Sequence, residues 1–431
     1  MKRIMQLAAA LLLLPGIALA DDGLQAADTS WILTSTALVL FMTLPGLAMF
    51  YGGLVRSRNV LSILLQCFAI AGLVSILWMV VGYSIAFAEG GAYFGGLSRA
   101  MFAGMQEETL SGGLPESLFA LFQMTFAIIT PALIIGGFAE RTRFSAVLLF
   151  SAIWLLVVYA PVTHWVWGGG WLGSMGLLDF AGGTVVHITA GVAALVAALV
   201  IGPRRGFPET PMMPHNMTMS VAGAGMLWVG WFGFNGGSAL AANGDAAMAM
   251  LVTHLSAAAG AMTWMFYEWV KYGKPTALGA ITGMVAGLGT ITPASGFVGP
   301  AGALVIGVSA GIVCFNATLL IKRVWKIDDS LDVFPVHGVG GMLGTLFAGI
   351  FASTELGIFS GQGFADGIDS MGQQVGVQLT GIVATALYTA VATFVILKVV
   401  GMLTGGLRVT PDEESQGLDT TQHEERGYVN L

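Results

Sequence analysis

The chain has 431 residues, of which 56% are hydrophobic and only 10% carry a charge. Because about a quarter of the residues in a soluble domain are usually charged, this composition excludes a soluble globular protein and predicts one that lies mostly within a lipid bilayer. The net charge of -7 excludes the basic character typical of nucleic-acid binding, and the only two cysteines, Cys67 and Cys314, lie in apolar runs, which excludes a disulfide framework.

The first stretch, "MKRIMQLAAALLLLPGIALADDG", predicts a secretory signal peptide over residues 1–20. It has a basic start, a short apolar run and small residues before Asp21, as such peptides do. An uncleaved first membrane helix is the alternative, but the apolar run is shorter than the roughly 20 residues that a span needs. Cleavage after Ala20 leaves the mature N-terminus outside the cell.

Eleven later stretches are apolar and long enough to cross about 30 Å of hydrocarbon. The predicted spans are 30–54, 60–88, 115–138, 143–167, 180–202, 216–240, 244–270, 275–294, 298–322, 333–353 and 374–404. The sequence therefore predicts an all-α polytopic membrane protein, with a membrane domain over 21–404 and a short polar tail over 405–431.

Lysine and arginine in the loops predict the orientation, because cytoplasmic loops carry the excess of both. With the N-terminus outside, the outer loops hold only Arg99. The inner loops hold Arg56, Arg58, Arg141, Arg143, Arg204, Arg205, Lys271, Lys274, Lys322, Arg323 and Lys326. This asymmetry supports an N-out, C-in topology with the tail in the cytoplasm.

Two stretches repeat one spacing of acid and histidine. "LDFAGGTVVHITAG" has Asp179 eight residues before His187, and "DDSLDVFPVHGVGG" has Asp329 eight residues before His337. They begin the fifth and the tenth span, which cross the bilayer in opposite directions. This pattern predicts a 5+5 inverted repeat plus one extra helix, an arrangement that places transporter sites near the midplane.

Helix geometry separates each acid from its own histidine. If Asp179 caps the fifth helix, eight residues advance His187 by about 12 Å and rotate it about 80° past two full turns. His187 then lies near the bilayer centre, and His337 reaches a similar depth from the other face. Ionisable groups at that depth are functional by default, so we expect the two rings to meet as a neutral pair that hands protons along a narrow pore. No metal ligands accompany the pair and no haem motif supports it, so we expect neither a metal nor a cofactor.

Aromatic residues are expected on the outer side of this pair. Trp167 ends the fourth span and Ser238 lies near the outer end of the sixth. Phe234, one helical turn before Ser238, and Phe126 of the third span are expected deeper in the membrane. A tryptophan face attracts a cation, and a serine hydroxyl accepts a hydrogen bond from an ammonium N–H. For the other aromatic residues of this region, Trp165 and Trp171, interfacial anchoring is an equal alternative. The remaining histidines are expected in ordinary packed or exposed positions, and they are His164, His215, His254 and His423.

Six motifs in register with the spans resemble the ammonium transporter (Amt/Rh) family, in particular its bacterial Amt branch. They are "FYGGLVRSRN", "FAERTRFSAVL", "THWVWGGGWL", "LDFAGGTVVHI", "GWFGFNGGSA" and "DVFPVHGVGGMLG". The tail "GLRVTPDEESQGLD" resembles the same branch, but the chain then has His423-Glu424-Glu425 where His-Gly-Glu is common. The outer loop at 89–115 matches no family pattern.

The resemblance implies a homotrimer with one pore in each subunit. It implies that Trp167, Ser238 and Phe126 form an outer recruitment site for ammonium, and that Phe126 and Phe234 form a gate. It also implies that His187 and His337 are the twin-histidine pair of the pore. Asp179 supports the outer site, chiefly by holding its backbone.

The expected function is ammonium uptake through the bacterial inner membrane. Ammonium loses a proton at the outer site and crosses as NH3, while the proton follows through the histidines, so transport is electrogenic. A PII-type signalling protein is the expected cytoplasmic partner, and Arg56, Arg58, Arg204 and Lys271 are the expected landing surface for it.

Three alternatives fit the sequence less well. A cation-coupled symporter of another small solute needs a carboxylate at the midplane, and none is evident. An intramembrane enzyme needs a nucleophile beside a base, and Ser238 lies above the histidines. A pure ammonium sensor usually adds a signalling domain, which the tail is too short to form, although sensing alongside transport stays open.

Overall fold

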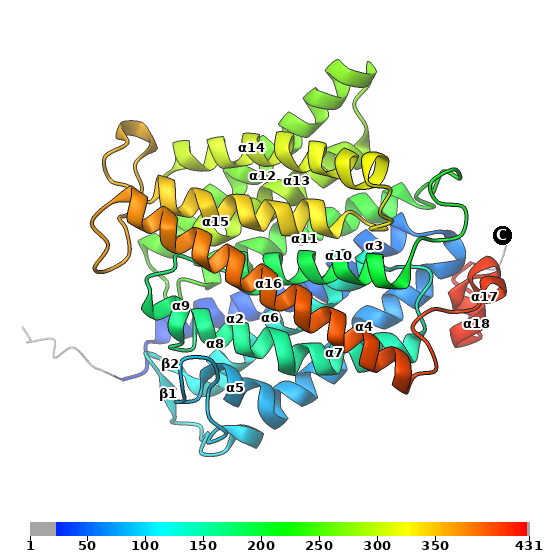
Figure 1. Ribbon diagram of the computed structural model, residues 1–431. Helices are drawn as coiled ribbons and strands as arrows, with labels where there is room; N and C mark the ends of the chain where they lie inside the picture. Colours follow the sequence, from blue (N-terminus) through cyan, green and yellow to red (C-terminus); the bar gives the residue numbers. More distant parts are fainter. Residues whose placement is uncertain (1–22, 429–431) are drawn as a thin grey trace, which may run out of the picture.

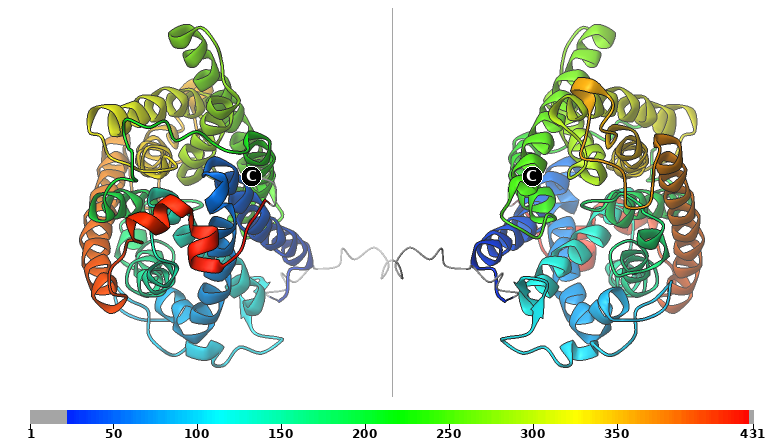
Figure 2. Two further views of the ribbon diagram at one scale, coloured as in Figure 1. Left: turned by 90° about the vertical axis from the view of Figure 1, so that its right-hand side faces the viewer. Right: turned by 90° about the vertical axis from the view of Figure 1, so that its left-hand side faces the viewer.

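The computed structural model describes residues 23–428. The predicted signal peptide over 1–20 lies outside the described residues. Long helices lie side by side in one bundle, and the loops lie at its two ends (Figure 1). The tail lies across one end of the bundle (Figure 2). We call this the tail end and the opposite end, where Trp167 lies, the Trp167 end.

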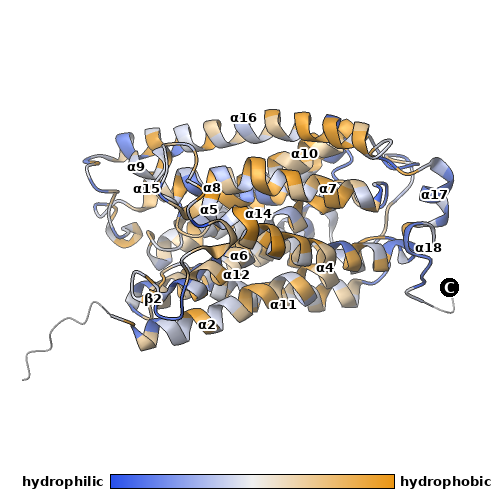
Figure 3. Cartoon of the chain, turned by 90° about the horizontal axis from the view of Figure 1, so that it is seen from below, coloured by the Kyte–Doolittle hydropathy of each residue, from blue (hydrophilic) through white to orange (hydrophobic). Residues whose placement is uncertain are grey.

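Eleven spans in the described part of the chain are long and apolar enough to cross a membrane. They are Ala26–Leu54, Ser57–Phe87, Glu116–Gly137, Phe144–Ser174, Gly183–Ile201, Met217–Gly237, Gly244–Tyr272, Ala277–Ala294, Pro300–Val324, Phe334–Phe351 and Met371–Leu403. The predicted all-α membrane fold with eleven spans is therefore confirmed. Apolar residues dominate the middle of the helices, and polar residues dominate the ends and the tail (Figure 3). This is expected of spans in lipid, where an α-helix satisfies its own backbone hydrogen-bonding groups.

Most spans are built from more than one helical segment. The first five spans contain α2 (Ala26–Phe41), α3 (Ala48–Leu54), α4 (Val60–Leu77), α5 (Tyr83–Phe87), α6 (Glu116–Ile134), α7 (Phe144–Trp154), α8 (Ala160–Val166), α9 (Trp171–Ser174) and α10 (Thr189–Ile201). The next six contain α11 (Met217–Gly237), α12 (Gly244–Tyr272), α13 (Ala277–Ile291), α14 (Pro300–Leu319), α15 (Gly340–Phe351) and α16 (Met371–Leu403).

Short π-helical and 3-10 segments join or extend these helices. The π-helical turns are η1 (Met42–Leu47), η3 (Trp78–Gly82), η6 (Leu155–Tyr159), η7 (Gly183–Ile188), η9 (Leu320–Val324) and η10 (Phe334–Val339). The 3-10 turns are η2 (Ser57–Asn59), η4 (Ala100–Phe102), η5 (Ile135–Gly137), η8 (Thr292–Ala294) and η11 (Gly357–Phe359). Such π turns are frequent at functional sites, and η7 and η10 each hold one histidine of the expected pair.

The two histidine-bearing spans pack backbone against backbone. A Cβ atom on Gly191 of α10 would collide with the backbone of Gly338 in η10. Only glycine permits this approach, which is the way that small residues bring helices together in membranes. The close crossing fixes His187 and His337 on facing helices.

The polar segments outside the spans are ordered by hydrogen bonds. The loop before α6 forms a small hairpin of β1 (Leu110–Ser111) and β2 (Leu114–Pro115). The tail folds into α17 (Pro411–Gln416) and α18 (Leu418–His423). Asp419 accepts hydrogen bonds from the backbone N–H groups of Leu61 (3.1 Å) and Ser62 (2.8 Å), so the tail caps the start of α4.

Candidate functional site

A cavity of about 200 Å³ opens at the Trp167 end of the bundle. Its walls are Phe87, Phe119, Gln123, Phe126, Trp167, Phe180, Ser238 and Leu240. The rings of Trp167 and Phe126 meet edge to face, with centroids 6.0 Å apart. The Ser238 hydroxyl donates to the Phe234 carbonyl oxygen at 2.8 Å, so its own oxygen stays available as an acceptor. The structure thus brings Trp167, Phe126 and Ser238 around one cavity, where ring faces and a hydroxyl oxygen can receive a small cation.

Asp179 organises the backbone beside this cavity. Its carboxylate accepts from the backbone N–H groups of Gly182 (2.9 Å), Gly183 (2.6 Å) and Thr184 (2.8 Å), and also from the Thr184 hydroxyl. Its carbonyl oxygen accepts from the indole N–H of Trp167 at 2.9 Å. Asp179 therefore holds both the start of the fifth span and the tryptophan of the cavity.

The fifth span does not start as an α-helix at Asp179, so the predicted distance and rotation between Asp179 and His187 were wrong. The helix begins at Gly183, three residues later than the predicted start, and its first turn is η7, a π-helical turn. The advance and rotation expected of an α-helix starting at Asp179 therefore do not apply. The acid and the histidine are nevertheless separate, since the hydrogen bonds of Asp179 go to backbone groups and to Thr184.

Two stacked phenylalanines close the cavity on its inward side. The rings of Phe126 and Phe234 have centroids 4.2 Å apart and are tilted by 32°. Both side chains are about 1% exposed. Beyond them lies a lumen of only about 10 Å³, which is at the lower limit of the space that one water molecule needs. A hydrated ion cannot pass this constriction as the side chains stand.

His187 and His337 lie in contact on the far side of the phenylalanines. Their Nδ1 atoms are 3.1 Å apart, and their rings are nearly parallel, tilted by 14° with centroids 5.2 Å apart. Both side chains are buried. Since one nitrogen must donate and the other accept, the pair shares a single proton between its Nδ1 atoms. His187 Nε2 has no hydrogen-bond partner within residues 23–428, so it is free to bind a molecule in the lumen.

A third cavity leads from His337 toward the tail end. It holds about 90 Å³, and its walls include His337, Tyr51, Lys322 and Asp332. The Lys322 ammonium and the Asp332 carboxylate are 2.8 Å apart there. His337 borders both this cavity and the lumen, so the three cavities form one interrupted path through the bundle.

The comparisons with known proteins agree with this architecture. Residues 30–428 match the model of the Ammonium Transporter Family. The chain belongs to this family. It is thus a multi-pass membrane transporter rather than an enzyme.

Relatives of the family match over almost the full chain. The ammonium transporter of Bacillus subtilis is 46% identical over 407 residues, which are 94% of this chain and 99% of that protein. Ammonium transporter Amt1 of Archaeoglobus fulgidus is 45% identical over 404 residues, 93% and 99% of the two chains. Among solved structures, the Sensor Amt Protein has a TM-score of 0.85 at 30% identity, covering 92% of this chain and 98% of its own. Mep2 of Saccharomyces cerevisiae has a TM-score of 0.82 at 36% identity, covering 91% and 92%.

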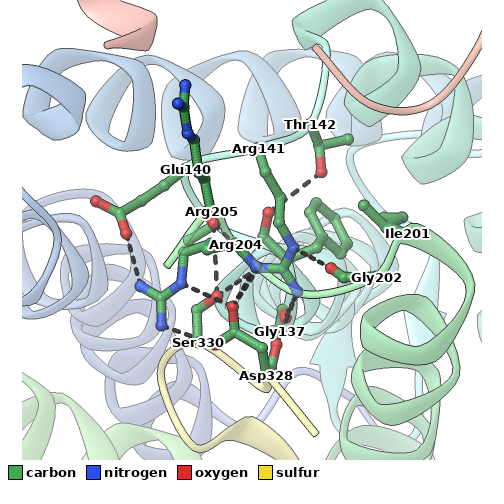
Figure 4. Close-up of polar contacts among 12 residues, drawn as sticks. Gly137, Glu140, Arg141, Thr142, Ile201, Gly202, Arg204, Arg205, Asp328 and Ser330 are labelled. Carbon is green, nitrogen blue, oxygen red and sulfur yellow. Dashed lines mark hydrogen bonds and ion pairs between the residues drawn. The ribbon is translucent and has the colours of Figure 1, made fainter. Parts of the chain in front are cut away.

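A buried charge network crosses the tail end of this ammonium transporter family member (Figure 4). Arg204 pairs with Glu140 at 2.6 Å and with Asp328 at 2.8 Å, and Arg56 pairs with Glu140 at 2.8 Å. Burial works to raise the pKa of the Glu140 and Asp328 carboxyls, but their arginine partners outweigh it and hold both below the ordinary range. Burial also lowers the pKa of Arg141 to about 10.

This network corrects the prediction that Arg204 forms part of a docking surface for a PII-type partner. Arg204 is only 5% exposed and its guanidinium is occupied by Glu140 and Asp328, so it is not free to meet a partner. A basic residue in a short loop is normally exposed, but here two carboxylates from distant loops draw it inward. Arg58 and Lys271 are exposed, although the Lys271 ammonium lies over the Phe315 ring at 5.3 Å.

The other histidines of the described chain border none of the three cavities of the path. His164 is buried with Nδ1 3.0 Å from the Ala86 carbonyl oxygen and Nε2 2.8 Å from that of Gly91. His254 is exposed beside Trp228. Trp165 and Trp171 pack on each other, with ring centroids 5.9 Å apart.

Sequence reasoning missed one ring that touches the pair. Trp231 stacks on His187 at 5.5 Å between centroids, tilted by 15°, and its indole N–H donates to the Thr292 hydroxyl at 2.9 Å. It lies three residues before Phe234, so both face the same side of α11. That spacing was the available signal for placing Trp231 in the lumen.

Proposed function

We propose that this protein transports ammonium across a membrane by binding NH4+ in the Trp167 cavity and passing NH3 through the lumen. The observation that carries the proposal is the order of chemistry along the path. A cavity suited to a cation is followed by a closed phenylalanine pair and then by two histidines in contact. A small neutral molecule such as NH3 suits this path better than an ion does, because the lumen is narrow and mostly apolar.

Desolvation explains the selectivity of this path. An ion that enters an apolar lumen loses hydration worth far more than the lumen returns. Sodium and potassium have no alternative form, whereas ammonium can release a proton and continue as NH3. The phenylalanine pair and the narrow lumen that the two histidines line therefore reject metal cations together, without having to recognise them.

The histidine pair offers the released proton a separate route. Two imidazoles that share one N–H can exchange donor and acceptor roles, which moves a proton from one ring to the other. We infer that NH3 and the proton cross separately and that net NH4+ movement makes transport electrogenic. The contact between His187 and His337 at 3.1 Å supports this route.

The loop charges and the resemblance to the family support the biological setting that we propose. The Trp167 end faces the outside and the tail lies in the cytoplasm, in a bacterial inner membrane, after removal of residues 1–20. The membrane domain is 21–404 and the cytoplasmic tail 405–431. The protein is a homotrimer in the lipid bilayer, and a PII-type protein docks at the tail end.

Charge movement in proteoliposomes tests the mechanism. Currents on a solid support are compared after ammonium jumps and potassium jumps for the wild type, His187→Ala and His337→Ala. His254→Ala is the matched control, because His254 is exposed on α12. The wild type is expected to give ammonium currents only, and each pair variant to lose discrimination against potassium.

Two outcomes would contradict parts of the proposal. Ammonium uptake without any current in the wild type would exclude electrogenic transport. Unchanged currents and selectivity in both pair variants would remove the histidines from the mechanism.

The alternatives have less support. The relatives at 46% and 45% identity are named ammonium transporters, whereas the structure named Sensor Amt Protein is 30% identical. A symporter for another solute would need an ion site that no observed group in the lumen supplies, since the lumen walls among the described residues are apolar apart from the two histidines and Trp231.

A further inference from the structure

An irregular segment carries the outer half of the site. Between α9 and η7, residues 175–182 form turns and bends rather than a helix. Leu178 and Asp179 are each about 5% exposed there. Backbone groups buried at this level need partners from the protein itself, because lipid supplies none.

One side chain of the last span provides those partners. The amide oxygen of Gln378 accepts from the Leu178 backbone N–H at 2.9 Å, and its amide nitrogen donates to the Leu178 carbonyl oxygen at 2.8 Å. The same nitrogen also donates to the Thr345 carbonyl oxygen of α15 at 2.9 Å. Gln378 thus pairs with Leu178 as a neighbouring strand would, and it ties the irregular segment to the span that holds His337.

A second glutamine completes the arrangement. Gln374, one turn earlier on α16, donates to the Gln378 amide oxygen at 3.2 Å and to the Gly176 carbonyl oxygen at 2.9 Å. Its own oxygen accepts from the Ala365 backbone N–H at 2.9 Å. Both glutamines are fully buried, although α16 otherwise runs along the face of the bundle (Figure 1). All four hydrogen-bonding positions of the Gln378 amide are used.

We propose that Gln378 is a positioning residue for ammonium recruitment. It fixes Leu178, and the next residue, Asp179, presents the carbonyl oxygen that holds the Trp167 indole at 2.9 Å. Through Thr345 it also fixes the distance between this segment and α15. The last span, which borders none of the three cavities of the path, therefore sets the geometry of the Trp167 cavity. This inference rests on the recruitment role proposed for that cavity.

The chemistry of the amide makes glutamine specific for this role. Leucine has nearly the same shape but leaves the buried Leu178 N–H and carbonyl oxygen without the partner that Gln378 provides, which costs more than the hydrogen bonds themselves were worth. It also removes the hydrogen bond to the Thr345 carbonyl oxygen. A protonated glutamate keeps one acceptor and one donor in the same positions. Gln378→Glu is therefore a partial rescue, whereas Gln378→Leu removes the pairing.

The test separates affinity from turnover. Ammonium-evoked currents are measured against concentration for the wild type, Gln378→Leu, Gln378→Glu and Trp167→Leu, and for the double variant Gln378→Leu/Trp167→Leu. Gln373→Leu is the control, because Gln373 is an exposed glutamine on the same helix. Currents are normalised to the amount of monodisperse protein, so that a loss of folded protein is not mistaken for a lower transport current.

The expected result is a change in half-saturation. Gln378→Leu should raise the half-saturating ammonium concentration about tenfold, with the maximal current within about twofold of the wild type. The half-saturating concentration of Gln378→Glu should lie between those of Gln378→Leu and the wild type. That of Gln373→Leu should match the wild type. In the double variant the effect of Gln378→Leu should vanish, because two changes that act through one group do not add.

The outcomes distinguish this inference from the proposed function. If Trp167→Leu raises the half-saturating concentration and Gln378→Leu changes only the maximal current, Gln378 is merely structural and the inference fails. If Trp167→Leu has no effect, the recruitment role of the cavity fails instead. Full additivity in the double variant would overturn the route through Trp167.

Discussion

The rings of Phe126 and Phe234 pack with centroids 4.2 Å apart. They lie between the Trp167 cavity, which can bind a cation, and the histidine pair, which can move a proton. Phe126 also meets Trp167 edge to face at 6.0 Å, and Phe234 lies 6.1 Å from the ring of His187. The four rings form one continuous series from the Trp167 cavity to the lumen. A molecule can pass only if Phe126 and Phe234 move, so this pair sets which species leave the cavity.

Removing one ring of the pair should widen the path. Phe234→Ala is expected to admit potassium and to give potassium currents that the wild type lacks, while ammonium currents persist. The lost packing should also destabilise the protein by about 3 kcal/mol. Potassium-jump currents and thermal unfolding in detergent measure the two effects. Phe232→Ala, two residues away and outside the cavities of the path, is the control, and equal potassium exclusion in both variants would contradict a gate.

Asp179 should matter more for the order of its segment than for proton transfer. Asp179→Asn replaces one carboxylate oxygen with an NH2 group that faces backbone donors, and hydrogen bonds to a charged acceptor contribute roughly 1.5–3 kcal/mol each. We expect a lower unfolding temperature together with a higher half-saturating ammonium concentration. Asp366→Asn, at an exposed loop position, should change neither. A variant with wild-type stability but no transport would instead indicate a chemical role for the carboxylate.

The spans could be predicted from the sequence because each segment that crosses a membrane must by itself contain an apolar run of sufficient length. Continuous apolar length is a local property, and the ends of the eleven predicted spans differ from the observed ones by at most seven residues, the largest difference being at the end of the fourth span. The pairing of His187 with His337 was accessible for a similar reason. Two segments of one pattern entering from opposite faces reach a common depth, and the structure has the two rings in contact.

Other features depend on contacts that no single segment encodes. The fifth span begins at Gly183 with the π-helical turn η7, and the Asp179 carboxylate accepts from the four backbone N–H groups of residues 182–185 there. Arg204 has the sequence of an exposed loop residue, yet Glu140 and Asp328 come from two other loops to bury it. Gln378 lies on α16, which runs along the face of the bundle (Figure 1), and its partner Leu178 is 200 residues away.

The arginine at the centre of the buried network should be a major source of stability. Arg204→Ala leaves two buried carboxylates without their main cation, which typically costs about 3–5 kcal/mol. Arg205→Ala is the matched control, since the Arg205 side chain is exposed and donates to the Ser415 hydroxyl of the tail. The unfolding temperature should fall by several degrees in the first variant and change little in the second. Equal unfolding temperatures for the two variants would show that the network contributes little.

The same network predicts a loss of stability in acid. The folded pKa values of Glu140 and Asp328 lie below their ordinary values of 4.5 and 3.8. Their contribution is therefore complete above the ordinary values and is lost as the pH falls through the folded values. The unfolding temperature of the wild type should drop as the pH is lowered from about 5 to about 3, and that of Arg204→Ala should drop less. Glu107→Gln, at an exposed acid, should follow the wild-type curve.

Asp329 should show the opposite dependence. It is fully buried, one oxygen accepts from the Phe334 N–H at 2.7 Å, and the other has no hydrogen-bond partner within residues 23–428. Burial raises the pKa of this carboxyl from 3.8 to about 6, and Asp332 adds to the effect, while the Phe334 N–H and Lys322 oppose it. Because the folded value exceeds the unfolded one, the folded state binds the proton more tightly, and stability falls as the pH rises from about 4 to about 6.

Asp329→Asn tests this cost directly. The asparagine keeps an oxygen for the Phe334 N–H and removes the buried charge, so the variant should unfold at a higher temperature than the wild type at pH 7.5. The advantage should shrink at pH 4.5, where the wild-type carboxyl is protonated. Glu355→Gln, at an exposed carboxyl, should give no such pH-dependent difference. If Asp329→Asn is less stable than the wild type at pH 7.5, the ionised carboxylate stabilises the start of η10, and the protein depends on the charge of Asp329 to hold the span of His337 in place.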